Sequence, residues 1–495
     1  MKTYWGDIHS HCAASYGYGT PKRALENAKS HLDFCSITGH AFWPDMPMDL
    51  KTQNNVLIMH FGGFQKLQYF WKELMTELKA ANKPGKFITL PSYEWHSMKY
   101  GDYNVYYNMN DAPLIDAPTL PELIKATSKY KAILLPHHCS YLSGFRGTRW
   151  KDFDSAVSPL VEIFSNHGCG ESDDAYYDYY HTMGPRVKET SVREGLLQGH
   201  KFGFYASTDT HDGYPGHYGH GRIGVICDKL DRQNLWNAIQ KRRTLASTGA
   251  RFEVSAHLNG GFIGESVRTE KEMELKIDLT GTAPLELVEL VEGFGKNCKL
   301  HRLPMPTLST EFSSGKYKIK IECGWGRKNI VHNWDIDIKI KNGKLLDATQ
   351  YCRFSSYEME EEKATEKLSI SKNTLNWKCR TKQNPAGLLG GTHFGAGGTQ
   401  NLVIELDTSA KTELELKCGN STIKTSIKKL VNGSCGKAVA GFCSPSLKIH
   451  RAVPEKEYSF NYETKFVPSG EKGFIYIRAK QTDGQMLWTS PIWRE

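Results

Sequence analysis

Short apolar runs that end in a histidine or a carboxylate recur through the first half of the chain. They close at His40, Glu94, His137–His138 and Asp209–His211. Between them lie segments whose apolar positions have helical spacing, at residues 21–31, 62–81, 120–128 and 235–243. Strands that alternate with helices in this way predict an α/β fold with a β/α barrel. Such barrels keep their active sites at the carboxyl ends of the strands, so these polar side chains should meet at one mouth.

The pattern changes near residue 250 to short strands with strict alternation of apolar and polar positions. Segments 252–258, 273–279, 316–322 and 334–340 show it, and this spacing predicts an antiparallel β-sandwich. We therefore expect three parts: a metal-binding barrel at 1–250, a sandwich-like domain at 251–345, and a β-rich region at 346–495 packed on the rest. The charged run 358–367 is expected to form a short linker helix. Trp488 and Trp493 in the last strands should be buried.

The opening stretch, residues 4–15, carries the first candidate ligands. Read as a strand, it places Asp7, His9 and His11 on one face, where two imidazoles can hold one cation. An isolated pair of this kind fits a half-buried strand equally well. The distribution of histidine favours a metal site, because fourteen of the nineteen histidines lie in residues 1–220.

Taken together, these motifs resemble those of a known superfamily. His9-x-His11, His40, Glu94, His137-His138 and Asp209-x-His211 are similar to the ordered metal motifs of the PHP (polymerase and histidinol phosphatase) superfamily. Segments 161–171, 242–251 and 487–493 resemble a branch of undefined function with a β-rich region and a Trp-Ser-Ser-Pro-Ile-Trp-like tail. The resemblance spans nearly the whole chain and implies a distorted (β/α)7 barrel and dependence on metal ions.

The resemblance also implies a ligand set. A first ion is expected at His9, His11, Glu94 and Asp209, a second at Glu94 and His137, and a third at His40 and His211. His138 stays an alternative to His137, and Asp102 stands nearest to the position of a further ligand. Gly17 occupies a position where the family has Asp or His, so the third site should be weak or empty. Two ions, or three if that site fills, are expected; mixed imidazole and carboxylate ligands suit zinc, manganese or iron.

The predicted chemistry is metal-dependent hydrolysis of an ester, most directly a phosphoester. Two ions lower the pKa of a shared water and neutralise charge on a phosphoryl group. We expect Arg146 or Arg149 to hold the remaining oxygens, His167 to act as acid for the leaving alcohol, and Glu171 to orient His167. Sulfate-ester or amide hydrolysis is the alternative within the enzyme class. From another class, the chain could be a non-catalytic carbohydrate-binding protein with a degenerate site.

Composition limits the kinds of molecule that the protein is expected to bind. The net charge of +9 mildly favours a small-molecule or carbohydrate-linked anionic substrate, and the absence of a Lys/Arg run of five argues against nucleic acid. The twelve cysteines are scattered without a Cys-x-x-Cys pair, as expected of reduced thiols. No apolar run is long enough to cross a bilayer, and no signal opens the chain. We therefore expect a cytoplasmic protein that contacts no membrane; the oligomeric state stays open.

Overall fold

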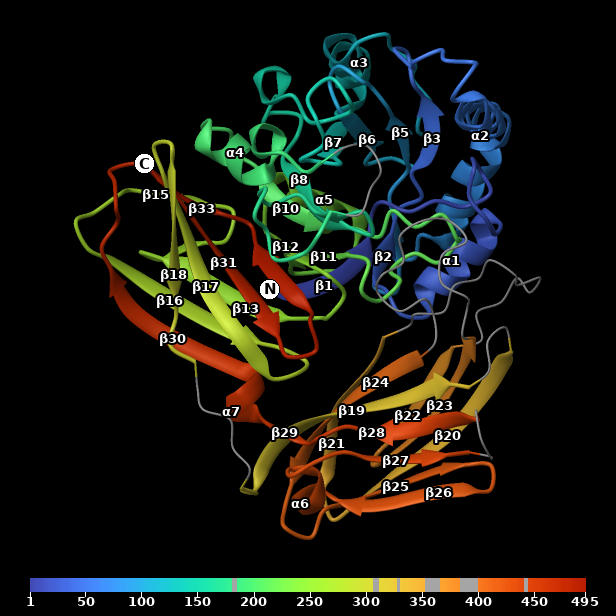
Figure 1. Ribbon diagram of the computed structural model, residues 1–495, viewed down its shortest axis with the longest axis vertical. Coiled ribbons are helices and arrows are strands. Elements are labelled where there is room, and N and C mark those ends of the chain that lie inside the picture. The colour runs from blue at the N-terminus through green and yellow to red at the C-terminus, as the bar shows by residue number, and fades with distance from the viewer. Residues whose placement is uncertain (180–184, 306–310, 327–329, 352–365, 383–398, 440–443) are drawn as a thin grey trace.

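The computed structural model describes residues 1–179, 185–305, 311–326, 330–351, 366–382, 399–439 and 444–495. The chain is a mixed α/β protein with many strands and few helices. Figure 1 shows helices around one end of the molecule, a β-layer with the C-terminal strands beside them, and a separate β-sandwich at the opposite end. The predicted linker helix at 358–367 lies almost wholly outside the described residues.

The longer helices all belong to the amino-terminal region, residues 1–250. They are α1 (Pro21–Lys29), α2 (Asn54–Ala81), α3 (Leu120–Thr127), α4 (Val192–Leu197) and α5 (Arg232–Gln240), with short 3-10 turns at Ser128–Tyr130, Trp150–Asp152 and Lys188–Thr190. The predicted start of α1 is confirmed: Pro21 is its first residue, and the Thr20 side chain accepts a hydrogen bond from the Arg23 amide. Helix α2 begins eight residues earlier than the sequence pattern predicted.

The strands of the amino-terminal region belong to three hydrogen-bonded sheets. The first contains β1 (Lys2–Asp7), β2 (Phe34–Cys35), β4 (Ile88–Thr89), β11 (Arg222–Cys227) and β12 (Thr244–Ser247). The second contains β3 (Gly39–Phe42), β5 (Ser92–Trp95), β6 (Asp102–Tyr106) and β7 (Ile133–His137), and the third β8 (Leu160–Ser165), β9 (Gly168–Cys169) and β10 (Gly203–Ala206).

Among the described residues, these pairings do not close into the barrel that the sequence predicted. One break lies between β4 and β5, where the chain passes from the first sheet to the second through Leu90 and Pro91. Proline has no amide hydrogen to donate to a neighbouring strand, so a ladder cannot continue evenly through it.

The C-terminal strands join the amino-terminal region. Strands β31 (Gly473–Gln481), β32 (Met486–Thr489) and β33 (Ile492–Arg494) extend the first sheet, with Ala246 of β12 paired to Trp488 of β32. Residues from both sides of the expected boundary at 250 thus share one sheet. The predicted burial of the two tail tryptophans is confirmed, since Trp488 is 0% and Trp493 5% exposed.

A second β-layer packs against this extended sheet. It consists of β13 (Glu253–Leu258), β14 (Gly261–Phe262), β16 (Met273–Thr280) and β30 (Ser459–Phe466), while β15 (Ser266–Val267), β17 (Leu285–Phe294) and β18 (Asn297–Arg302) belong to the extended sheet. In β16 every second residue is buried, as the alternation predicted. Apolar residues of both layers form one core cluster.

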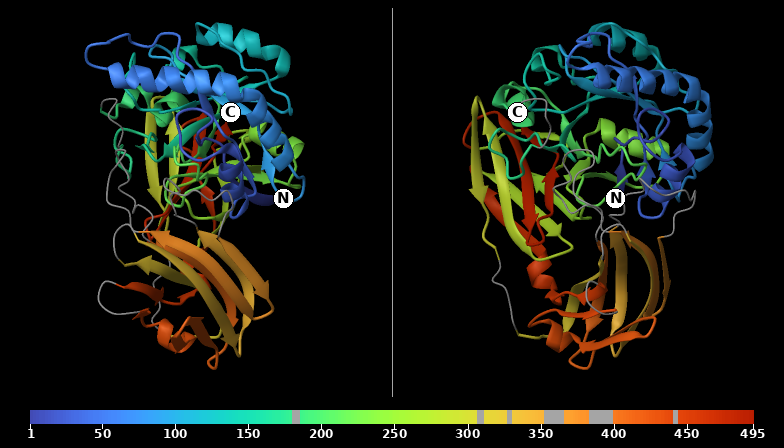
Figure 2. Two further views of the ribbon diagram at one scale, coloured as in Figure 1. Left: turned by 90° about the vertical axis from the view of Figure 1, so that its right-hand side faces the viewer. Right: turned by 45° about the vertical axis from the view of Figure 1, so that its right-hand side comes forward.

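The separate sandwich lies at the end opposite to α2 (Figure 2). One sheet has β19 (Gly315–Trp325), β21 (Lys344–Tyr351), β24 (Thr399–Thr408), β27 (Cys435–Ala438), β28 (Pro445–Ile449) and β29 (Val453–Pro454). The other has β20 (Val331–Lys341), β22 (Lys367–Ser371), β23 (Thr374–Lys382), β25 (Glu413–Cys418) and β26 (Ser421–Ser426); α6 (Ile427–Leu430) and α7 (Glu455–Tyr458) follow strands. The sandwich has its own apolar core around Trp334 and Trp377. Residue 345, an expected domain boundary, lies inside β21.

No helix in the described part of the chain combines the length and the hydropathy needed to cross a membrane.

Candidate metal centre

The first two candidate ligands follow the end of β1. His9 and His11 are almost completely buried, and the segment is held by hydrogen bonds from the Asp209 amide to the His9 carbonyl and from the His11 amide to the Thr210 carbonyl. Asp7 serves this backbone rather than the centre: it accepts hydrogen bonds from the amides of His9, Thr208 and Gly216. The pairing brings the opening stretch against the segment that carries Asp209.

The other candidate ligands converge on these histidines from several elements. His40 lies on β3, Glu94 lies on β5, and His96 directly follows the end of β5. Asp102 begins β6, His137 ends β7, and Asp209 and His211 follow β10. Within the described residues, five groups have ligand atoms that all lie within 4.8 Å of one another. They are His9–His11–Asp209, Glu94–Asp102–His137–His138, His40–Glu94–His96, His11–His40–His211 and His138–His167–Asp209.

The first group holds three of the four residues that the resemblance assigned to a first ion, and the fourth, Glu94, lies beside it. Asp209 Oδ1 lies 2.9 Å from His11 Nε2 and 3.3 Å from His9 Nε2, and Glu94 Oε2 lies 4.0 Å from His9 Nε2. Two atoms that bind one transition-metal ion lie about 3 to 4 Å apart, because each bond is about 2.1 Å long. The spacing therefore suits a shared ion.

Glu94 connects this group to the next. Its other oxygen, Oε1, lies 2.8 Å from His137 Nε2. His138 also points inward and its Nε2 lies 3.6 Å from Asp209 Oδ2. Two consecutive residues reach the same centre because His138 adopts a left-handed backbone conformation, φ 55°. The sequence offered His137 and His138 as alternatives; the structure brings both together.

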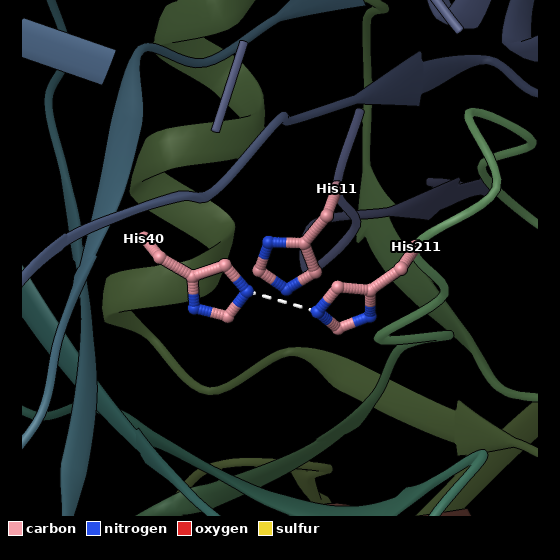
Figure 3. A group of neighbouring side chains, drawn as sticks. All are labelled: His11, His40 and His211. Carbon is pink, nitrogen blue, oxygen red and sulfur yellow. Dashed lines mark hydrogen bonds between the residues drawn. The ribbon is translucent and has the colours of Figure 1, made fainter. Parts of the chain in front are cut away.

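Three histidines form a further group (Figure 3). His40 Nε2 and His211 Nε2 are 2.9 Å apart, and the His11 ring stacks on both. Tyr16 fills the side where the sequence lacks a carboxylate: its hydroxyl lies 2.8 Å from His40 Nδ1 and its ring stacks on His40. At Gly17 a Cβ atom would lie 2.8 Å from backbone atoms of Cys12, so an aspartate does not fit there without a backbone shift.

Two residues of the centre were missed as ligands or ligand partners by sequence reasoning. His96 Nδ1 lies 3.4 Å from Glu94 Oε1, and its Nε2 lies 3.0 Å from His40 Nδ1. The signal was present, because Glu94-x-His96 has the same strand spacing as His9-x-His11. Glu162 lies on β8, and its Oε2 atom lies 2.9 Å from His9 Nδ1. A carboxylate at that nitrogen orients the ring and leaves Nε2 for a ligand bond.

Burial and charge set the protonation states of the centre. Burial lowers the pKa of His11, His40 and His138, and it lowers that of His211 to about 3. Burial alone would raise the pKa of Glu94, but His96, His40 and His137 hold it well below its usual range. Neutral imidazoles beside ionised carboxylates are the forms that bind metal ions.

His9 is the exception. Burial alone would lower its pKa, but Asp209 and Glu162 raise it to about 10. The excess of carboxylates thus attracts positive charge to this point, and a metal ion bound here would release the proton.

Buried atoms without a hydrogen-bond partner test whether a metal ion fits. His9 Nε2, His11 Nδ1 and His137 Nδ1 are such atoms. Leaving a buried polar atom unpaired costs about 1–3 kcal/mol. His9 Nε2 and Glu94 Oε2 face each other across 4.0 Å, and one ion can bind both atoms. The residues therefore fit a metal centre.

Of the four residues that were predicted to act on substrate, two lie at the metal centre and two do not. His167 is half-buried at the centre, with Nε2 2.8 Å from Asp209 Oδ2. Arg146 is buried there too and bonds Asp102. Arg149 instead pairs with Asp152 and lines a cavity of about 610 Å³ with Lys99 and Lys151.

Glu171 differs from its predicted role of orienting His167. Its carboxylate accepts hydrogen bonds from Tyr476, Arg478, Arg193 and Trp488, at 2.6 to 3.1 Å. These contacts tie the loop after β9 to the C-terminal strands, because the carboxylate is buried and needs donors on every side.

Comparisons with known proteins are distant. No family profile matches the chain. Uncharacterised proteins of Chlamydia pneumoniae, Chlamydia muridarum and Chlamydia trachomatis are 23%, 23% and 25% identical to it over 45%, 42% and 42% of its length. The matches cover 39%, 37% and 37% of those proteins, so the chain spans about two fifths of the curated relatives it matches.

One solved structure is similar in part. It is a two-domain protein from Bacteroides vulgatus containing a predicted PHP-like metal-dependent phosphoesterase. It is 13% identical, and the match covers 63% of this chain and 82% of that one with a TM-score of 0.31. The function must therefore be argued from the residues of the site.

Proposed function

We propose that the protein is a metal-dependent hydrolase, and specifically a phosphoesterase. The observation that carries the proposal is the sharing of buried carboxylates between ligand groups: Glu94 and Asp209 each belong to two of them. A carboxylate with one oxygen toward each of two groups is the arrangement that holds adjacent metal ions. The likeness of these motifs to those of the PHP superfamily supports the same conclusion.

The residues around the metal centre have different roles in the proposed reaction. Bound divalent ions lower the pKa of a coordinated water and neutralise charge on an attacked phosphoryl group. Glu162 holds the His9 ring in the orientation that leaves Nε2 toward Asp209, and Tyr16 holds His40 from its other side. His167, 22% exposed, is the acid that gives a proton to the leaving oxygen. The substrate is a small anionic molecule, in keeping with the net positive charge.

The test is turnover of matched aryl phosphate and aryl sulfate esters by the purified full chain, before and after chelation. We expect phosphate-ester hydrolysis that is lost on chelation and restored by zinc or manganese. Asp209→Asn should lower the rate of phosphate-ester hydrolysis by at least about 100-fold, because losing a ligand should cost more than losing a residue that only orients one. Glu322→Gln, on the distant sandwich strand β19, is the control and should retain full activity. Sulfate turnover alone, or no turnover with a full metal content, would overturn the proposal.

A further inference from the structure

An arginine lies between two of the ligand groups. Arg146 Nε and Nη2 lie 2.7 Å and 2.5 Å from Asp102 Oδ2, and Nη2 lies 3.1 Å from His96 Nδ1. Asp102 belongs to the group with Glu94, and His96 to the group with His40. A guanidinium cannot accept a hydrogen bond, so it uses the same lone pairs that a metal ion would use.

The surrounding loop is built to hold this side chain in place. Arg146 has a left-handed backbone conformation, φ 68°, which is unfavourable for a residue with a Cβ atom. Its amide donates to the Met98 carbonyl, and the guanidinium lies 5.0 Å from the centre of the Trp43 ring. At Gly147 a Cβ atom would lie 2.2 Å from the Tyr141 carbonyl oxygen, so the tight turn requires glycine. The backbone of this loop is therefore strained at Arg146, and the side chain of that residue is buried.

The positive charge of Arg146 neutralises the carboxylate of Asp102. Asp102 is completely buried, and a buried carboxylate is stable only beside a positive partner. Its Oδ2 lies 4.0 Å from His137 Nε2, which is within the span of two ligands on one ion. Either a metal ion or a guanidinium could therefore neutralise Asp102, and the structure contains the guanidinium.

We propose that the Arg146 guanidinium stands in for a metal ion at the cation position bounded by Asp102 and His96. The inference rests on the proposed metal centre and changes its composition. Asp102 and His96 then accept hydrogen bonds from Arg146, while metal ions would be held by the groups that contain Asp209 and His11. One positive charge of the centre cannot be removed by chelation and remains available to a substrate anion.

Metal content of the full chain tests this inference without an activity assay. Wild type, Arg146→Met, Arg146→Lys and Arg149→Met are equilibrated with manganese or zinc, desalted and measured by elemental analysis. Arg146→Met should retain one more ion per chain than wild type, because it frees Asp102 and His96. Arg146→Lys, which keeps a charge, and Arg149→Met, on the same loop but paired with Asp152, should match wild type.

A second pair of measurements guards against misfolding and adventitious binding. Adding Asp102→Asn to Arg146→Met should abolish the extra ion, because the ligand is lost along with the buried charge. In wild-type crystals, anomalous scattering at the metal edge should show no ion bonded to Asp102. An ion at Asp102 in wild type, or no gain in folded Arg146→Met, would overturn the inference alone. A wild type without any bound metal would overturn the proposed function as well.

Discussion

Glu94 uses its two oxygens for different neighbours. Oε1 faces His137 at 2.8 Å, and Oε2 faces His40 at 2.8 Å and His11 at 3.6 Å. His40, in contrast, contributes to the edge of the centre, where Tyr16 already contacts its Nδ1. The two residues should therefore differ in their importance for metal binding.

Replacing Glu94 by Gln should remove more metal than replacing His40 by Gln. The amide carries no charge and cannot bridge two ions, whereas loss of His40 leaves the ligands around Asp209 intact. Elemental analysis should show most metal lost from Glu94→Gln and at most one ion lost from His40→Gln. Equal losses in the two variants would argue against a bridging role for Glu94.

His167 has two interpretations that one variant separates. It belongs to a ligand group with His138 and Asp209, yet it is more exposed than His9 or His11. If it is the acid, His167→Gln should keep the metal content and lower activity by about 100-fold or more. The loss should be smaller for substrates with acidic leaving groups, which need no proton. Loss of metal would identify His167 as a ligand instead.

At the scale of elements, the C-terminal strands are anchored through one buried carboxylate. Glu171 binds Tyr476 and Arg478 of β31 and Trp488 of β32. Arg478 also pairs with Glu289 of β17, so the network joins three strands and the loop after β9. Strands β31 and β32 therefore help to stabilise the amino-terminal region.

Glu171→Gln should destabilise the protein by about 3 kcal/mol, as expected when one charge of a buried network is removed. Burial alone would raise the pKa of Glu171, but Arg478 and Arg193 hold it below the usual 4.5. The carboxylate therefore stabilises the fold fully above about pH 4.5 and loses this effect as the pH falls through its folded pKa. In denaturant unfolding, the difference between wild type and variant should shrink below that pH.

The matched control is Glu286→Gln on the same strand as Glu289. Glu286 is half-exposed and pairs with Lys480 at 3.2 Å, so its loss should cost less than about 1 kcal/mol at any pH. A similar cost for both variants would mean that the Glu171 network contributes no more than a surface ion pair.

In the whole molecule, the ligand groups found in the described residues all belong to the amino-terminal region, and none includes a residue of the sandwich. The sandwich has its own core and touches the amino-terminal region through small contacts, such as Gln350 to the Ser30 carbonyl and Tyr218 against Tyr351. A ligand stabilises the part of a protein that binds it, by about 2.7 kcal/mol when present at 100 times its dissociation constant.

Chelation should therefore loosen one part of the molecule only. In hydrogen exchange, peptides from β1, β5 and β10 should lose protection when metal is removed and regain it when metal is added. Peptides from β20 and β23 in the sandwich should not change. An equal loss in the sandwich would show that the two parts unfold as a single unit.

Much of the site could be predicted because its signals are local. Alternation along an extended stretch places His9 and His11 on one face, and a strand end places Asp209 and His211 at the same edge. His96 obeys the same rule and could have been found by it. The position of Arg146 could not, because a flexible side chain on a glycine-rich loop has no period that indicates where its charge will lie.

The type of each element and the residues at its ends could be inferred from the sequence alone, since both depend on spacings of two to four residues. The start of α1, the alternation in β16 and the burial of Trp488 follow from such spacings. The division of strands among three sheets depends on packing of the whole chain. So do the contact of Glu162 with His9, 153 positions away, and the hydrogen bond from Tyr476 to Glu171, 305 positions away. A buried charge takes the partner that packing brings to it, and packing depends on the whole chain.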